Sequence, residues 1–213
     1  ATQPMEPDRV HIAVLAGGQS RRMGSNKALL KLAGRTLIER VLRAVEPLAL
    51  PILIIGDPST YGHLKYPVHP DRRPNLGPIG GLYTALTTAS GPIMLLGCDQ
   101  PFLTPNFLRY ILGRRNPAHH NAIVPHTAEG SQPLCALYEP TCLRAIELAI
   151  EANKFSMRGL LRELDLDEIS MGHWRCYDEC GLLFCNLNTP EEFDRAQKAL
   201  QSTKKAPDRK ARR

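Results

Sequence analysis

Residues 10–27 read VHIAVLAGGQSRRMGSNK. The run of six apolar or small residues at 12–17 predicts a β-strand that is buried on both faces, since successive positions in it lack polar side chains. Glycines at 17, 18 and 24 follow, among two arginines and a lysine. Glycine lets backbone N–H groups converge on an anion, and arginine and lysine pair with phosphate. The stretch therefore indicates a triphosphate-binding loop between a buried strand and a helix; an ordinary turn with surface arginines is the alternative.

Strands and helices alternate along the rest of the chain. A capping box at Thr36–Glu39, Thr104 before Pro105, and Thr189 before Pro190 each mark the start of a helix. Further strands are expected at 51–55, 66–71 (an edge), 93–99, 122–125, 133–138 and 182–188, and helices after about 36, 77, 104, 140 and 189. This order predicts an α/β fold with a doubly wound, mostly parallel sheet, to which 121–185 adds a small lobe.

The composition is that of a soluble globular protein. The chain has 213 residues, 43% of them hydrophobic and 23% charged, with no apolar run near the ~20 residues of a membrane span. Residues 1–9 carry no signal-peptide pattern, so we expect a cytoplasmic protein and no membrane contact. Of the net charge of +6, residues 204–213 supply six cations against one acid. We expect one domain, 1–200, and a disordered basic tail, 201–213, without nucleic-acid binding.

Two further features are predicted to lie near the loop. Asp99 ends the buried strand that begins at Ile93, and ligands in open α/β sheets bind at the carboxyl ends of strands. Because Thr104 is the better N-cap of the next helix, Asp99 is left as a natural Mg²⁺ ligand. The pair Gly80–Gly81 at the start of a helix is either a tight turn or a shelf for a planar base.

The loop sequence LAGGxSxRMGxxK, residues 15–27, resembles the signature of the molybdenum cofactor guanylyltransferases. Four more stretches resemble that family in order: Asp71 with GPIGG at 77–81, CDQPF at 98–102, QPLCALY at 132–138 and NLNTPEE at 186–192. The resemblance covers about residues 10–200. It implies a Rossmann-like nucleotidyltransferase fold, and transfer of GMP from GTP to molybdopterin carrying molybdenum, with Mg²⁺ and release of pyrophosphate. Molybdoenzymes or their chaperones are further partners that it implies.

The resemblance also assigns residues. Those implied to bind GTP are Leu15, Ala16, Gly17, Gly18, Gly24, Lys27, Asp71, Gly80 and Asp99, and those implied to be catalytic are Arg22, Lys27 and Asp99, with Asp99 as metal ligand. Asn186 and Asn188 are implied to close the acceptor side. One departure concerns the base: the family often has an asparagine just after the second strand, where this chain has Gly56 and Asp57.

Lys154, Arg158 and Arg162 have a spacing of four residues, which predicts a basic face on one helix. An anionic pterin acceptor needs such a face, so Lys154 and Arg158 are candidates for acceptor binding; a solvated face is the alternative. Cys176, Cys180 and Cys185 lack the paired spacing of a zinc site, so unbonded thiols are the favoured interpretation over a metal site.

Other functions stay open at this point. A CTP-dependent molybdopterin cytidylyltransferase, or a transferase for another small phosphorylated acceptor, would use the same fold. A non-catalytic nucleotide-binding or delivery protein would not need both Lys27 and Asp99. A dinucleotide-dependent oxidoreductase is disfavoured, because the loop lacks GxGxxG.

Overall fold

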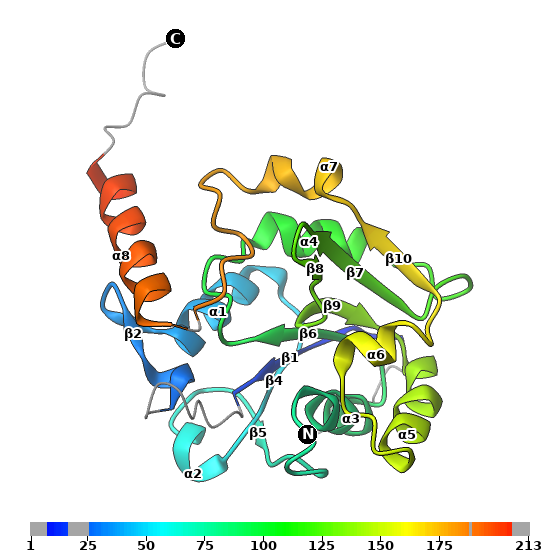
Figure 1. Cartoon of the computed structure of the whole chain (residues 1–213). Coiled ribbons are helices and arrows are strands. Elements are labelled where there is room, and N and C mark those ends of the chain that lie inside the picture. Colours follow the sequence, from blue (N-terminus) through cyan, green and yellow to red (C-terminus); the bar gives the residue numbers. More distant parts are fainter. Residues whose placement is uncertain (1–7, 17–25, 188, 206–213) are drawn as a thin grey trace.

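A computed structural model describes residues 8–16, 26–187 and 189–205. Its core is an eight-stranded sheet in the order β10-β7-β9-β6-β1-β4-β5, with β8 paired to β7 (Figure 1). The strands are β1 (His11–Leu15), β4 (Ile52–Ile55), β5 (Val68–His69), β6 (Ile93–Gly97), β7 (Ala122–Thr127), β8 (Gly130–Ser131), β9 (Cys135–Tyr138) and β10 (Leu166–Ile169). A separate hairpin joins β2 (Lys31–Leu32) to β3 (Arg35–Thr36).

The strand directions bring most carboxyl ends to one edge of the sheet. β1 runs parallel to both β4 and β6, and β5 runs parallel to β4. β9 runs antiparallel to β6 and to β7, so β7 points the same way as β6, and β10 is parallel to β7. The loops after β1, β4, β6 and β7 therefore leave the sheet at the same edge, as the mostly parallel prediction requires.

Helices cover both faces of the sheet (Figure 1). α1 and α4 pack on one face, in a cluster with Ile12 and Val14; α3, α5 and α6 pack on the other, in a cluster with Ala13 and Leu15. The helices are α1 (Leu37–Val45), α2 (Pro58–Tyr61), α3 (Pro78–Ala89), α4 (Pro105–Gly113), α5 (Leu143–Glu151), α6 (Met157–Leu161), α7 (Met171–Trp174) and α8 (Pro190–Lys205). Short 3₁₀ turns are η1 (Lys27–Leu29), η2 (Glu46–Leu48), η3 (Pro140–Cys142) and η4 (Arg175–Tyr177).

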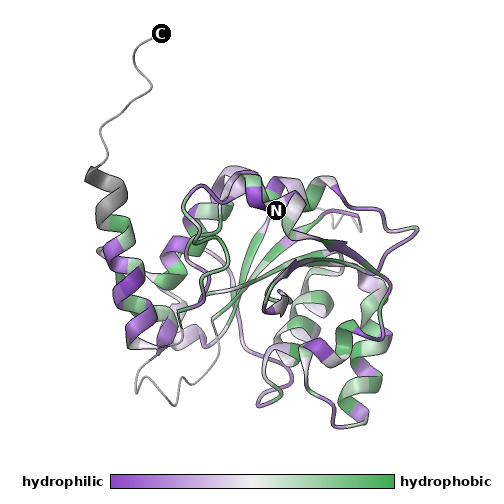
Figure 2. Cartoon of the chain, turned by 45° about the horizontal axis from the view of Figure 1, so that its top comes forward, coloured by the Kyte–Doolittle hydropathy of each residue, from purple (hydrophilic) through white to green (hydrophobic). Residues whose placement is uncertain are grey.

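The alternation of β1 between the two clusters confirms the first prediction. Successive residues of a strand point to opposite faces, so a strand covered on both sides must be apolar throughout. Ile12, Ala13 and Val14 have no exposed surface. Figure 2 shows the same pattern across the sheet, with hydrophobic central strands and polar residues gathered on the outer helices and loops.

The predicted helix starts are confirmed. Thr36 and Glu39 form the reciprocal capping box of α1, and the Thr104 hydroxyl accepts from the N–H of Phe107 at the start of α4. At α8, Glu192 accepts from the Thr189 N–H at 2.9 Å and its own N–H donates to the Thr189 hydroxyl at 3.2 Å. Caps are local, because the cap side chain reaches donors only two or three residues away.

Two predictions for the second half of the chain are wrong. Residues 182–188 form no strand in the part of the segment that is described; instead, Asp178 Oδ1 accepts from the N–H groups of Leu182 and Leu183, at 2.9 and 3.1 Å. The apolar run there fills the core without a ladder, since Phe184 packs edge-on against Trp174 at 4.8 Å between ring centres. Nor do residues 121–185 build a separate lobe, because β7, β9 and β10 continue the main sheet.

The strand β10 and the hairpin β2–β3 were not predicted. β10 carries two consecutive charged residues, at 167 and 168, which break any apolar alternation, and the Arg114–Asp167 ion pair holds it on the sheet edge. At the C-terminus, α8 continues to Lys205, beyond the expected end of the domain at 200, and the rest of the basic tail lies outside the described residues. Within those residues the helices are all too short or too polar to span a bilayer.

Candidate active site

The ends of β1 and β6 lie side by side at the carboxyl edge. Their register pairs Leu15 with Gly97, so the segment after β1 and the residues after β6 leave the sheet together. Segment 17–25 and Asp99 thus begin at neighbouring points, as the sequence predicted. Asp71 follows β5 on the same edge, further along the sheet.

Lys27 and Asp99 meet at this edge although they are far apart in sequence. The Lys27 ammonium donates to Asp99 Oδ2 at 3.1 Å, and the two side chains are 13% and 23% exposed. Both are therefore largely removed from water and yet still open to a ligand. A fixed cation beside a carboxylate can hold a phosphate oxygen and a divalent metal next to each other.

Gly97 makes room for the Asp99 carboxylate. A Cβ on Gly97 would lie 2.6 Å from Asp99 Oδ1 and 3.3 Å from the Leu134 Cβ. Gly97 is fully paired in β6, so its lack of a side chain matters here for space rather than for backbone freedom. The sequence analysis missed this residue; a glycine at the end of a buried strand, two positions before an acid, was the available signal.

Asp71 is fixed by the start of α3. Its Oδ1 accepts from the Thr84 hydroxyl and from the Arg73 N–H, both at 2.9 Å. A Cβ on Gly80 would lie 2.5 Å from the Arg73 carbonyl oxygen and 3.1 Å from Asp71 Oδ2, and one on Gly81 would lie 2.7 Å from Leu15. Close packing therefore explains why both positions need glycine: Gly80 lies against residues 71–73, and Gly81 lies against Leu15 of β1.

A pocket lies on the β7 side of the site, near the Asp99 backbone, and is called here the pocket beside Asp99; the Asp99 side chain is not part of its lining. The Leu187 N–H donates to the Asp99 carbonyl at 3.2 Å, which places Asn186 next to the end of β6. The pocket holds about 410 Å³, and its polar lining includes Glu129, Gln132, Asn186, Glu192 and Arg195.

Buried amides connect this pocket to the residue after Asp99. Gln100 is 2% exposed and donates through Nε2 to Gln132 Oε1 at 3.3 Å, and Gln132 Nε2 donates to the Thr127 hydroxyl at 3.0 Å. Among the described residues, none donates a hydrogen bond to Gln100 Oε1. Burying an acceptor without a donor costs free energy, so Gln100 Oε1 stands out among the buried polar atoms. The two amides form a second polar feature at the carboxyl edge, and it was not predicted from the sequence.

The family model for the MobA-like NTP transferase domain matches residues 12–169. The chain belongs to the family of MobA-like NTP transferases. The match begins at β1 and ends at β10, so it includes Lys27, Asp99 and the whole central sheet.

Curated relatives and a solved structure agree with the family. The chain is 32% identical to the molybdenum cofactor guanylyltransferase of Desulfosudis oleivorans, over 92% of this chain and 98% of the relative. It is 31% identical to a probable molybdenum cofactor guanylyltransferase of Pelotomaculum thermopropionicum, over 86% and 90%. The crystal structure of molybdopterin-guanine dinucleotide biosynthesis protein A from Archaeoglobus fulgidus superposes with a TM-score of 0.80 at 26% identity, covering 90% of this chain and 99% of that one.

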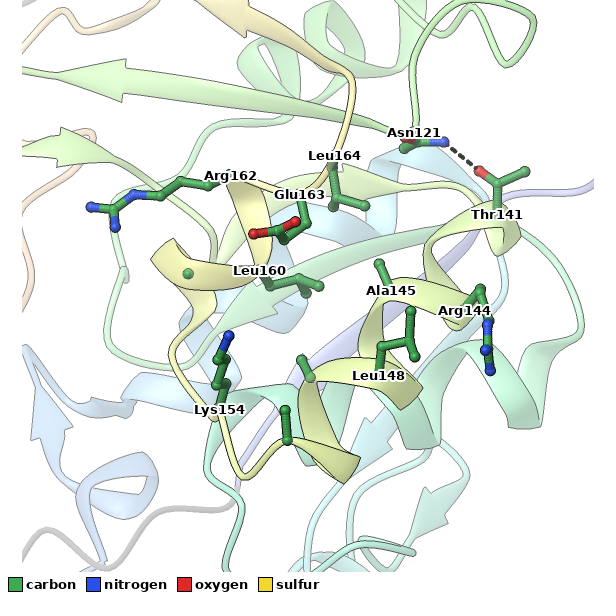
Figure 3. A pocket seen from close by; sticks show the side chains of 13 residues that line it. Asn121, Thr141, Arg144, Ala145, Leu148, Lys154, Leu160, Arg162, Glu163 and Leu164 are labelled. Carbon is green, nitrogen blue, oxygen red and sulfur yellow. Dashed lines mark hydrogen bonds between the residues drawn. The ribbon is translucent and has the colours of Figure 1, made fainter.

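The predicted basic face is wrong for this MobA-like chain. α6 holds only Arg158 of the three residues, because Lys154 lies in the turn before it and Arg162 follows its end. Lys154 and Arg162 line a different pocket, of about 830 Å³, between α5 and α6 (Figure 3). That pocket includes Asn121, which precedes β7, so it lies toward the opposite edge of the sheet.

Arg158 instead supports the pocket beside Asp99. Its Nη2 donates to the carbonyl of Glu129 at 3.0 Å, in the turn between β7 and β8. Gly130 at this turn has φ of +111°, a backbone conformation that favours glycine, and its Cβ position lies 3.4 Å from the guanidinium. The contact fixes a wall of the pocket through the backbone.

Several predicted site residues lie outside the described residues, namely Gly17, Gly18, Arg22, Gly24 and Asn188. Of the predicted thiol cluster, Cys176 and Cys180 are exposed and Cys185 lines the pocket beside Asp99. No group of three or more His, Cys, Asp or Glu in the described ranges is placed to hold a metal ion. Burial, and to a lesser degree the charge of Asp99, raises the pKa of the Cys98 thiol to about 12, so this thiol is protonated at neutral pH.

Proposed function

We propose that this chain transfers GMP from GTP to the terminal phosphate of molybdopterin that carries molybdenum, forming the guanine dinucleotide cofactor and releasing pyrophosphate. The observation that carries the proposal is the Lys27–Asp99 pair at the carboxyl edge of the sheet, just beyond the end of β6, in a chain whose curated relatives bear the name of that reaction. Nucleotidyl transfer needs positioning and charge neutralisation more than covalent catalysis, and this pair can supply both.

The proposed chemistry is one displacement at phosphorus. An oxygen of the acceptor's terminal phosphate attacks the α-phosphorus of GTP, the bond from that phosphorus to the bridging oxygen of the β-phosphate breaks, and pyrophosphate leaves. The attacking phosphate is already ionised at neutral pH, so the chain need not supply a general base. Lys27, with Arg22 and the backbone of Gly24, is assigned to the triphosphate, and Gly17 and Gly18 are assigned to the guanine and ribose.

The proposed base and ribose contacts come from the other side of the loop. Leu15, Ala16 and Gly80 are assigned to this wall, with Asp71 holding its outer end. Asp71 and Gly80 support the assignment through packing, because the carboxylate accepts from Thr84 in the second turn of α3 and lies against Gly80 in the first. Asp57 is not available in place of the family's asparagine, since its carboxylate caps α2 through the Ser59 N–H at 2.9 Å.

The family uses a divalent metal, and we propose that it is Mg²⁺ here. Mg²⁺ is usually held by one or two carboxylates together with substrate phosphates and water. A single, partly exposed carboxylate beside a lysine fits that description, so Asp99 would hold the ion. When bound, the ion would neutralise charge on the reacting phosphates.

The acceptor is assigned to the pocket beside Asp99, with Asn186 and Asn188 as its polar contacts. Arg158 is assigned an indirect part through Glu129, and Lys154 no part, since it lines the other pocket. Molybdoenzymes or their chaperones are proposed to receive the product.

A nucleotide panel tests the proposal. Thermal shifts are first measured with GTP, CTP, ATP and NAD, each with and without Mg²⁺. Pyrophosphate release is then measured with molybdopterin that carries molybdenum as the acceptor. We expect stabilisation and turnover with GTP–Mg²⁺ well above the other nucleotides, because a site built to hydrogen-bond one base rejects its analogues. Preference for CTP would transfer the assignment to a cytidylyltransferase, and tight GTP binding without turnover would indicate a binding protein.

A further inference from the structure

One buried tyrosine contacts both residues that flank segment 17–25. Tyr61 closes α2 and is 1% exposed. Its hydroxyl donates to the carbonyl oxygen of Ala16 at 2.8 Å and to Oδ1 of Asn26 at 2.9 Å. Ala16 directly follows β1, and Asn26 directly precedes η1. The single hydroxyl proton of Tyr61 is therefore shared by Ala16 and Asn26, the residues on either side of segment 17–25.

Gly56 provides the space for the tyrosine ring. A Cβ at this position would lie 3.0 Å from two carbons of the Tyr61 ring and 3.2 Å from the Ala16 Cβ. The Gly56 N–H is held by the His69 carbonyl of β5 at 2.9 Å, so the backbone there is fixed by the sheet. The ring consequently has a defined position at the carboxyl end of β4.

The contact with Asn26 leads on to the Lys27–Asp99 pair. The same Oδ1 of Asn26 accepts from the Ala28 N–H at 3.2 Å and so caps η1, which begins with Lys27. The Lys27 ammonium then reaches Asp99 after β6. Three contacts thus connect the ends of β4, β1 and β6 around the candidate site.

The hydroxyl is a donor at neutral pH. Burial raises the pKa of Tyr61 above its ordinary value of 10, so the proton stays on the oxygen.

We propose that the Tyr61 hydroxyl is a positioning group for the nucleotide: it ties Ala16 to Asn26 and thereby places Lys27 at Asp99 before GTP binds. This inference rests on the proposed function of the site. Groups that are ordered in advance lose less freedom when the ligand binds, so the tie raises affinity without touching the nucleotide. Its loss should weaken nucleotide binding and leave the acceptor pocket as it is.

The test is Tyr61→Phe, which removes the hydroxyl and keeps the ring beside Gly56. We expect the Kd for GTP–Mg²⁺ to rise about tenfold, as the loss of one or two net hydrogen bonds would give. The KM for the acceptor should stay within about twofold of wild type. Titration calorimetry and pyrophosphate release measure the two effects separately.

Tyr138→Phe is the matched control. The Tyr138 hydroxyl is also buried and also donates to a carbonyl, that of Pro133, at 2.9 Å. This variant should lose a similar amount of stability and keep its GTP affinity. A double-mutant cycle with Asn26→Ala tests whether the two side chains act together. In the Asn26→Ala background, Tyr61→Phe should raise the GTP Kd by no more than about a further twofold, whereas a general loss of stability would add its full effect.

The outcomes separate the inference from the function on which it rests. If the wild type binds GTP and Tyr61→Phe binds it with the same affinity, the inference is overturned and the proposed function is not. An equal loss of GTP affinity in Tyr138→Phe, or a full tenfold loss on top of Asn26→Ala, would also overturn it. Absence of GTP binding by the wild type would overturn the proposed function and the inference together.

Discussion

On the nucleotide side of the site, Asp99 stands two residues beyond the buried strand β6, and Lys27, the first residue of η1, reaches its carboxylate at 3.1 Å. On the acceptor side, Glu129 lies in a tight turn and Asn186 in a segment without a ladder. The first side is held by β1 and β6, whose register is fixed by burial on both faces. The second is held by single contacts such as the Leu187 N–H to the Asp99 carbonyl at 3.2 Å.

The difference shows which kind of site can tolerate change. A charge at the end of a buried strand has few alternative positions, so its loss removes an interaction that nothing nearby replaces. A pocket wall made by turns can shift by a few tenths of an ångström and keep most of its contacts. We therefore expect larger effects on the nucleotide side than on the acceptor side, and the following variants test that expectation in decreasing order of effect.

Asp99→Asn should have the largest effect. It keeps the shape of the side chain and removes the charge proposed to hold the metal, so turnover should fall by about 10²–10³-fold, as for other groups that stabilise charge in the transition state. Pyrophosphate release at saturating Mg²⁺ measures it. Asp165→Asn, an exposed residue before β10, is the control. Near-normal turnover of Asp99→Asn would place the metal elsewhere.

Lys27→Ala should weaken GTP binding by about 10–100-fold, the size expected for a charge-assisted hydrogen bond. The fold should remain, because the lysine lies at the end of a loop rather than in either apolar cluster. Lys31→Ala removes an exposed lysine from the nearby hairpin and should bind GTP as wild type does. Equal affinities for the two variants would end the assignment of Lys27 to the triphosphate.

Gly97→Ala should lower turnover by about tenfold and stability by about 1–3 kcal/mol, the usual cost of overpacking. The added methyl would meet the Asp99 carboxylate at 2.6 Å, so the carboxylate must move. Circular dichroism melts and turnover measure the two effects. Gly113→Ala is the control, since its Cβ position has no neighbour within 4 Å. A variant that loses stability but keeps its Mg²⁺ dependence would show that the carboxylate adapts.

Arg158→Ala should have the smallest effect, and it tests the acceptor side. Removing the contact with the Glu129 carbonyl should raise the acceptor KM by about fivefold, the cost of one net hydrogen bond, and leave the GTP Kd unchanged. Arg162→Ala, which lines the other pocket, should change neither. Loss of GTP binding in Arg158→Ala would reverse the comparison between the two sides.

The sequence predicted the elements whose signals are local or periodic. The buried strands, the capping box at Thr36, the N-cap at Thr189 and the start of α4 at Thr104 are all confirmed. The pairing of β1 with β6 was assumed and is confirmed. It allowed Asp99 to be placed beside the loop, because parallel strands end at a common edge.

The errors concern segments whose structure depends on distant contacts. The apolar run at 182–184 has the composition of a strand, but Asp178 turns the backbone and the ring of Trp174 takes up Phe184. The regular spacing of Lys154, Arg158 and Arg162 suggested one face, but the helix begins only at Met157. Spacing predicts a shared face only where a continuous helix carries it.

By itself, the sequence determined the buried parallel strands, the N-caps of the helices, and the positions of Lys27 and Asp99 along the chain after β1 and β6. Each of these features depends on residues that are close together in the sequence. Only the tertiary structure decided the room that Gly97 leaves for the carboxylate, the shared contact of Tyr61 with Ala16 and Asn26, and the route of residues 178–187 past Asp99. These depend on distances between segments that are far apart in the chain, and close packing sets such distances only once the whole sheet and its helices are in place.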